Sequence, residues 1–198
     1  MDRNLVTGLI IGAVGGVIIG YFAGDYHATS GTIPVSQGQP VQAAPIPGAM
    51  AQMAAQQRIA ANEAAVAADP KRVGAWVDLG NDYFDNHQPE KAVNAYGKAL
   101  ALFPAGTPAI PDILTDQGIM YRELKSFDKA IANFKQANKI NPKHLQSLHN
   151  LGIVYSQDLH NTAAAVDAWN KVIAIDPGSP QADQARKGIE ETKGHNHP

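Results

Sequence analysis

The sequence predicts an all-α protein in which stacked helical hairpins form an α-solenoid behind an N-terminal apolar helix. Gly80, Gly118 and Gly152 are each followed three residues later by a tyrosine. A proline, which ends a helix, follows these glycines after 24, 24 and 25 residues. A pattern that recurs at this spacing indicates repeated helix pairs. An uncharged run near the N-terminus indicates a helix of another kind.

The apolar run from Leu5 to Ala23 predicts a transmembrane helix within residues 1–24, because about 19 residues span a bilayer core. Arg3 precedes this run, and the next Lys or Arg is Arg58. The positive-inside rule then places the N-terminus in the cytoplasm and the rest of the chain in the periplasm or outside. We therefore expect a single-pass protein of the inner (cytoplasmic) membrane that contacts lipid through one helix. A cleaved signal peptide is the alternative.

Glycines recur at every fourth position of the same run and predict a face for close helix–helix packing. Such a face would allow self-association or docking to another membrane protein. A general abundance of glycine in membrane helices is the alternative explanation. The glycines are Gly8, Gly12, Gly16, Gly20 and Gly24.

The next segments are a linker and a helix. Residues 25–48 contain four prolines and three glycines without an apolar period, which predicts a flexible linker. Residues 49–70 are rich in Ala, Gln and Met and end at Asp69-Pro70, which predicts a helix that precedes the repeats. Whether this helix covers a surface of the repeats stays open at this point.

Residues 71–178 carry three copies of one helical hairpin, at about 73–106, 111–144 and 145–178. The pattern resembles the tetratricopeptide repeat, with W-x₂-L-G-x₂-Y, A-x₃-F and a final proline as its markers. Copy two has Gln117 where leucine is usual, and copy three has an extra residue in its inter-helix turn. Residues 179–193 predict a capping helix, and 194–198 a disordered tail. The first copy has every marker: Trp76, Leu79, Gly80, Tyr83, Ala92, Tyr96, Ala99 and Pro104.

Composition and motifs argue against an enzyme. The chain has no cysteine, which excludes disulfides and thiolate chemistry. It has no H-E-x-x-H, G-x-S-x-G or phosphate-loop motif, so we expect no catalytic residue, cofactor or metal. The net charge of −2 and the scattered Lys and Arg give no reason to expect nucleic acid.

The family resemblance implies that the first helix of each pair lines a concave groove for a protein or peptide. Asn81 is the only residue present from the family's carboxylate clamp for chaperone C-termini, because Ile119, His149 and Ile153 replace the other clamp residues. The resemblance therefore does not extend to that ligand class. Gly74, Asp112, Gln146 and Ser156 also fall on the groove. The candidate groove residues are Val77, Asn81, Phe84, Thr115, Ile119, Arg122, His149 and Ile153.

These observations predict a membrane-anchored scaffold or assembly factor that binds a protein partner through the groove of its repeats. The layout of anchor, linker and short array is also similar to accessory factors of c-type cytochrome maturation. A third interpretation is a structural subunit that docks into a larger membrane complex through the glycine face. Each interpretation is carried forward as an expectation.

Overall fold

The computed structural model describes residues 10–11, 17–18 and 47–194 of the chain. The chain divides into two compact units, Met1–Ala44 and Pro45–Pro198. We treat each unit by itself.

In the N-terminal unit, the described residues form two short strands instead of the expected helix. β1 (Ile10–Ile11) pairs antiparallel with β2 (Val17–Ile18), with Ile10 opposite Ile18. All four residues are β-branched, and such side chains favour a strand over a helix. A hydropathy argument counts them only as apolar and so misses this preference.

No helix in the described part of the chain is both long and apolar enough to cross a membrane. Together with the two strands, this finding contradicts the predicted inner-membrane localisation. The expectation of a single-pass protein with its repeats in the periplasm is therefore wrong, and the expected lipid contact has no support. The linker at 25–46, the tail at 195–198 and the glycine ladder lie outside the described residues. The ladder consists of Gly8, Gly12, Gly16, Gly20 and Gly24.

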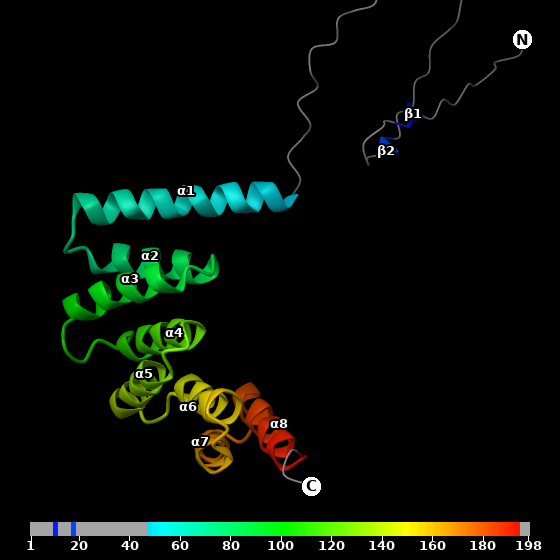
Figure 1. Cartoon of the computed structure of the whole chain (residues 1–198). Helices are drawn as coiled ribbons and strands as arrows, with labels where there is room; N and C mark the ends of the chain where they lie inside the picture. The colour runs from blue at the N-terminus through cyan, green and yellow to red at the C-terminus, as the bar shows by residue number, and fades with distance from the viewer. Residues whose placement is uncertain (1–9, 12–16, 19–46, 195–198) are drawn as a thin grey trace, which may run out of the picture. The chain divides into compact units, whose positions relative to one another are not determined.

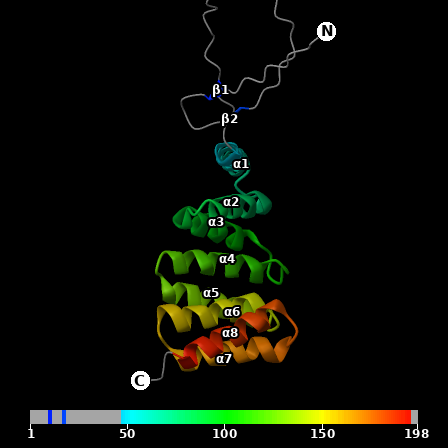
Figure 2. The same cartoon turned by 90° about the vertical axis from the view of Figure 1, so that its right-hand side faces the viewer.

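The C-terminal unit is an all-α solenoid, as expected (Figure 1). Figure 2 shows its helices stacked in chain order, from α1 at one end to α7 and α8 at the other. The helices of the three hairpins are α2 with α3, α4 with α5, and α6 with α7. The bounds are α1 Pro47–Ala68, α2 Val73–Asp85, α3 Pro89–Leu102, α4 Ile110–Glu123, α5 Phe127–Ile140, α6 Leu145–Ile153, α7 Thr162–Ile175 and α8 Pro180–Gly194.

A glycine and a buried aromatic ring hold each hairpin together. A Cβ added at Gly80 would lie 2.5 Å from Tyr96 Cδ1, and one at Gly118 would lie 2.6 Å from Phe134 Cε1. At Gly152 the ring of Trp169 takes the same place. Only glycine allows this close approach, so the recurring Gly-aromatic spacing in the sequence is a packing requirement. The partner positions Ala92, Ala130 and Ala165 are fully buried.

The extra residue in copy three is absorbed by a change of helix type. α6 continues as a π-helical turn, η1 (Val154–Asp158), in which the Leu159 N–H donates to the Val154 carbonyl at 3.1 Å. A π turn holds one residue more than an α turn. The hairpin turn that follows is therefore unchanged: His160 has φ 51°, close to the 55° of Lys125 in copy two.

α1 packs on the side of α2 that faces away from the predicted groove. The buried Asp82 carboxylate accepts from Arg58 Nε at 3.0 Å and from Asn62 Nδ2 at 2.8 Å. Val66 packs into the same core cluster as Leu79. At about 100° per residue, the groove positions lie roughly opposite this contact on α2. α1 therefore packs against the side of α2 that faces away from the predicted groove positions.

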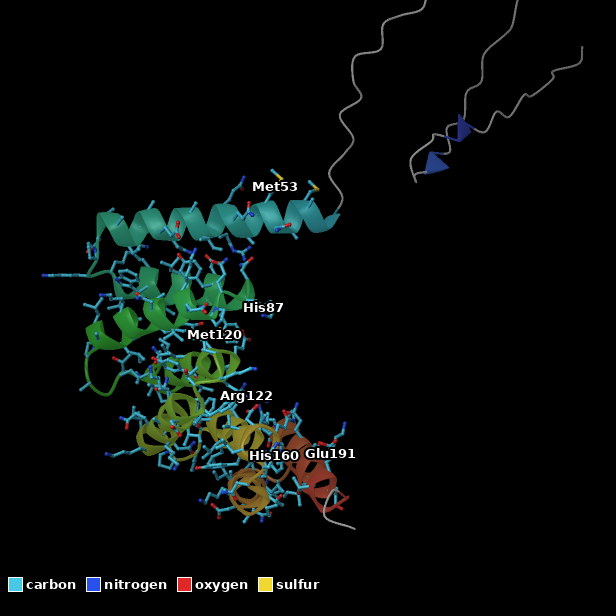
Figure 3. The ribbon with its side chains drawn as sticks, viewed as in Figure 1. Met53, His87, Met120, Arg122, His160 and Glu191 are labelled. Carbon is cyan, nitrogen blue, oxygen red and sulfur yellow. The ribbon has the colours of Figure 1, made fainter. Side chains whose placement is uncertain are left out.

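Both ends of the solenoid have a flanking helix. Trp169 extends beyond its hairpin, and a Cβ added at Gly188 of α8 would lie 2.7 Å from its Cη2 atom. Ala182 and Ala185 of α8 are fully buried in the same cluster. At the other end, Met53 is 57% exposed and points away from α2 (Figure 3). α8 therefore covers the last hairpin.

Candidate partner-binding groove

The predicted apolar groove residues are half-buried and divide between two parts of the solenoid. Val77, Phe84 and Ile119 pack against one core cluster, built from α1 to α4. Ile153 packs against the cluster that α6, α7 and α8 form. The structure therefore brings the α2 and α4 residues together, whereas Ile153 belongs to the far end of the array.

The predicted polar residues of the groove differ in how accessible their side chains are to a partner. The exposed Asn81 accepts a hydrogen bond from Tyr96 Oη at 2.9 Å and keeps its two amide N–H donors. Thr115 is only 1% exposed and donates from Oγ1 to the Pro111 carbonyl, so a partner has no access to it. His149 is half-buried, and burial lowers the pKa of its imidazole, which keeps it neutral.

Arg122, the one cation predicted for the groove, already has partners within the chain. Its Nε donates to Asp158, and its Nη2 donates to Gln157 Oε1 at 2.8 Å. Asp158 closes the π turn η1, so the extra residue of copy three helps to place this carboxylate. Figure 3 shows Arg122 between His87 and His160 along the edge of the stack where the hairpin turns lie. Arg122 therefore serves as a link between repeats.

A hollow of about 330 Å³ opens beside Ile119 and Arg122. Ile119 and Phe127 give it an apolar floor, and its rim carries charges of both signs. Its volume suits one aliphatic or aromatic side chain of a partner. The remaining lining residues are Glu123, Lys125 and Asp158.

A second hollow, of about 360 Å³, lies between α2 and α3. Trp76, Leu79 and Tyr83 contribute from α2, and Lys91 lies over the Tyr83 ring at 5.1 Å. Leu79 belongs to the side of α2 that contacts α1. This hollow therefore lies outside the groove of the first helices.

An acidic cluster between α2 and α4 is the part of the groove that spacing alone did not reveal. Burial, with the nearby charges of Asp112 and Asp85, raises the pKa of Asp116 to about 6, and His144 opposes this shift. His144 Nε2 lies 2.8 Å from Asp112 Oδ1. Tyr96 lies in the same field: burial first, and then the charges of Asp116 and Asp85, raise the pKa of its hydroxyl. Counting the acids on each predicted first helix is the signal that would have found the cluster.

The described residues contain no group of three His, Cys, Asp or Glu that is placed to hold a metal ion.

The side-chain amides of Gln117 and Asn133 are hydrogen-bonded to each other and have a structural role. Gln117 Nε2 donates to the Val93 carbonyl at 2.9 Å, and Gln117 Oε1 accepts from Asn133 at 2.8 Å. Gln117 thus replaces the usual leucine without leaving a buried polar atom unpaired.

Two tetratricopeptide repeat profiles match the chain, one over residues 73–105 and one over 111–144. Neither profile describes an enzyme. The small glutamine-rich tetratricopeptide repeat-containing protein 2 of Mycosarcoma maydis is 30% identical over 103 residues. That stretch covers 52% of this chain but only 27% of the relative. The match therefore leaves most of the relative uncompared.

Solved structures share the fold at low sequence identity. The crystal structure of MamA is 21% identical, with a TM-score of 0.58, over 73% of this chain and 90% of that one. The Sgt2 TPR domain from Aspergillus fumigatus is 23% identical, with a TM-score of 0.53, over 62% and 78%. The first TPR of Spaghetti (RPAP3), bound to the HSP90 peptide SRMEEVD, is 18% identical, with a TM-score of 0.54, over 63% and 94%. The chain therefore contains tetratricopeptide repeats, and its helical unit is a tetratricopeptide α-solenoid.

Proposed function

We propose that this protein is a scaffold or assembly factor that holds a protein partner in the groove of its first helices. The observation that carries the proposal is the open face of α2 and α4. α1 packs on the opposite side of α2 through Asp82, so no described helix occupies the groove. A scaffold needs such an accessible surface with apolar anchors and polar groups at its rim.

The hollow beside Ile119 supports the proposal, because it gives a partner side chain a place to be buried. Interfaces draw most of their affinity from a few anchors that fill such hollows. Solved tetratricopeptide structures also support it: the RPAP3 domains were determined with the peptides SRMEEVD and SGPTIEEVD. Those structures share only the fold with this chain, so they support peptide binding as a class.

The two alternative functions lose the observations on which they rested. The cytochrome-maturation interpretation rested on a layout with a membrane anchor, and the contradicted localisation removes that layout. The structural-subunit interpretation rested on glycines that lie outside the described residues. No observation on the helical unit favours either.

The groove is tested by the substitution Ile119→Asp in the full-length chain. A carboxylate on the floor of the hollow should abolish partner capture from a lysate of the source organism. The matched control is Ile140→Asp, because Ile140 ends α5, outside the groove, and is 40% exposed. Circular dichroism monitors whether both variants keep their helices. Capture that is equal in the two variants would refute the groove as the binding surface.

Phe84→Ala gives a second, milder probe of the same surface. It removes an aromatic side chain at the α2 end of the groove and introduces no charge. We expect partner capture to weaken without being lost, because Ile119 remains. Leu102→Ala, at an exposed apolar site on α3, is its control.

A further inference from the structure

Charge is distributed unevenly between the two kinds of helix. The first helices, α2, α4 and α6 with η1, carry seven Asp or Glu and a single Arg. The second helices, α3, α5 and α7, carry three Asp or Glu and six Lys. The overall net charge of −2 conceals this contrast. Two of the seven acids are paired within the chain, Asp82 with Arg58 away from the groove and Asp158 with Arg122. The first helices still carry a net negative charge, and the second helices carry a net positive one.

The lysines are held on the side of the second helices by aromatic rings. Lys91 lies over Tyr83 at 5.1 Å, Lys129 over Tyr121 at 5.4 Å, and Lys135 over Tyr155 at 5.9 Å. A cation over an aromatic face is attracted by the ring quadrupole. These contacts hold the three ammonium groups at aromatic rings, so their positive charge does not neutralise the groove carboxylates.

The one Arg or Lys on the described first helices is neutralised within the chain. Arg122 donates to Asp158 and to Gln157, and its side chain is two-thirds buried. An acidic partner would have to compete with the Asp158 carboxylate for this side chain. At the carboxylates of α2 and α4 the acidic tails of the peptides SRMEEVD and SGPTIEEVD would meet like charge, and the cation left at the rim of the hollow is Lys125.

Three carboxylates in or beside the groove keep their negative charge available. Asp85 is exposed and forms no ion pair within the described residues. Asp116 is half-buried, and no side chain in the described part of the chain donates a hydrogen bond to it. Asp112 contacts His144 but its side chain remains 71% exposed. The charges of Asp85 and Asp112 both reach Asp116, so α2 and α4 share one negative field.

We infer that the groove over α2 and α4 takes a cationic protein segment in which Lys or Arg side chains flank an apolar side chain. The apolar side chain fills the hollow over Ile119 and Phe127, and the flanking cations pair with Asp85, Asp112 and Asp116. Complementary charge speeds association and rejects acidic competitors. This inference rests on the proposed function, because it names the partner of the same groove.

The test is a selection on the full-length chain with a phage-displayed library of random 12-residue peptides. We expect the enriched peptides to carry Lys or Arg around one Leu, Ile or Phe. Replacing both Asp85 and Asp116 with Asn should weaken a representative selected peptide by about tenfold or more, measured by fluorescence anisotropy. Raising the salt concentration should weaken it too, because both carboxylates border solvent.

The matched control replaces Asp128 and Asp167 with Asn, which removes the same charge from the second helices. This variant should bind the selected peptides as the wild type does. An equal loss in the control and in the groove variant would mean that only net charge matters, and it would overturn the inference. Circular dichroism on both double variants shows whether they keep their helices, so that a loss of binding is not read from an unfolded chain.

The outcomes separate the inference from the proposed function. Enriched peptides that are acidic or neutral, and that Ile119→Asp no longer binds, would overturn the cationic segment and leave the groove in place. A library that yields no peptide above empty beads, together with partner capture that Ile119→Asp leaves intact, would overturn both. If no peptide is enriched but Ile119→Asp abolishes partner capture, only the inference of a cationic segment is overturned.

Discussion

The substitution Gly118→Ala should destabilise the solenoid although alanine is the better helix former. The added Cβ would lie 2.6 Å from Phe134 Cε1 and 3.0 Å from Cδ1 and Cζ. Phe134 is fully buried, so its ring has no free space to enter. Overpacking of this kind costs about 1–3 kcal/mol. The gain in helix propensity of about 1 kcal/mol offsets part of it. The net change is a loss of roughly 0–2 kcal/mol, and we expect the upper end of this range because the Phe134 ring is fully buried.

Gly97→Ala is the matched control within α3. Its nearest neighbour would be Gln117 Nε2 at 3.4 Å, which is ordinary van der Waals contact. Only the propensity term remains, so this variant should gain about 0.5–1 kcal/mol. The two alanines should thus shift stability in opposite directions.

Urea denaturation followed by circular dichroism at 222 nm measures both free energies of unfolding. Thermal melts should separate the two variants by roughly 5–10 °C. Equal stability of Gly118→Ala and Gly97→Ala would refute the account of the hairpin as a glycine packed against a rigid ring. A loss in both variants would refute it as well, because the open site should not resist a methyl group.

Three further predictions concern single contacts. Asp82→Ala leaves Arg58 and Asn62 without their acceptor and should cost about 2 kcal/mol of unfolding free energy. Hydrogen exchange should become faster in α1 and change little in α7. Unchanged exchange in α1 would contradict the role of Asp82 in holding α1 on α2. Asp116→Asn should raise stability at pH 7 by about 1 kcal/mol after allowance for solvent screening. The folded-state pKa of about 6 lies above the ordinary 3.8, so the folded chain binds the proton more tightly, and the wild type gains stability as the pH falls from 7 through 6 toward 4. The stability advantage of Asp116→Asn over the wild type should vanish near pH 4. A stability difference that persists at pH 4 in urea titrations would contradict the raised pKa of Asp116. Lys125→Gly should gain about 0.5–1 kcal/mol, because φ 55° is a strained conformation for lysine and not for glycine; Lys129→Gly, inside α5, should instead lose about 1 kcal/mol.

The repeats were predictable because their signal is a packing rule. Gly80 and Tyr96 must meet for the hairpin to close, so their spacing survives in each copy. The N-terminal segment was not predictable by the same means. An apolar run satisfies a hydropathy window whether it forms a helix or a strand, and only the β-branched Ile10 and Val17 distinguish the two. The prediction weighed length and charge and left side-chain shape out.

The predicted groove stays a prediction, and its charges could not be read from the spacing. Helix periodicity places Val77, Phe84 and Ile119 on related faces, and the three pack against one core cluster. It does not reveal that Arg122 pairs with Asp158, because 36 residues and a π turn separate the two. Helix periodicity also does not reveal that Thr115 is buried, because the burial of a helix position depends on the neighbouring helices.

The central claim, that the first helices form the partner-binding surface, is tested most directly by site-specific photo-crosslinking in the full-length chain. A benzophenone amino acid replaces Asn81, which is exposed on α2, and in a second variant replaces Lys98, which is exposed on α3. The account predicts that position 81 crosslinks to the partner and that position 98 does not. Crosslinks at position 98 alone, or with equal yield at both positions, would contradict it.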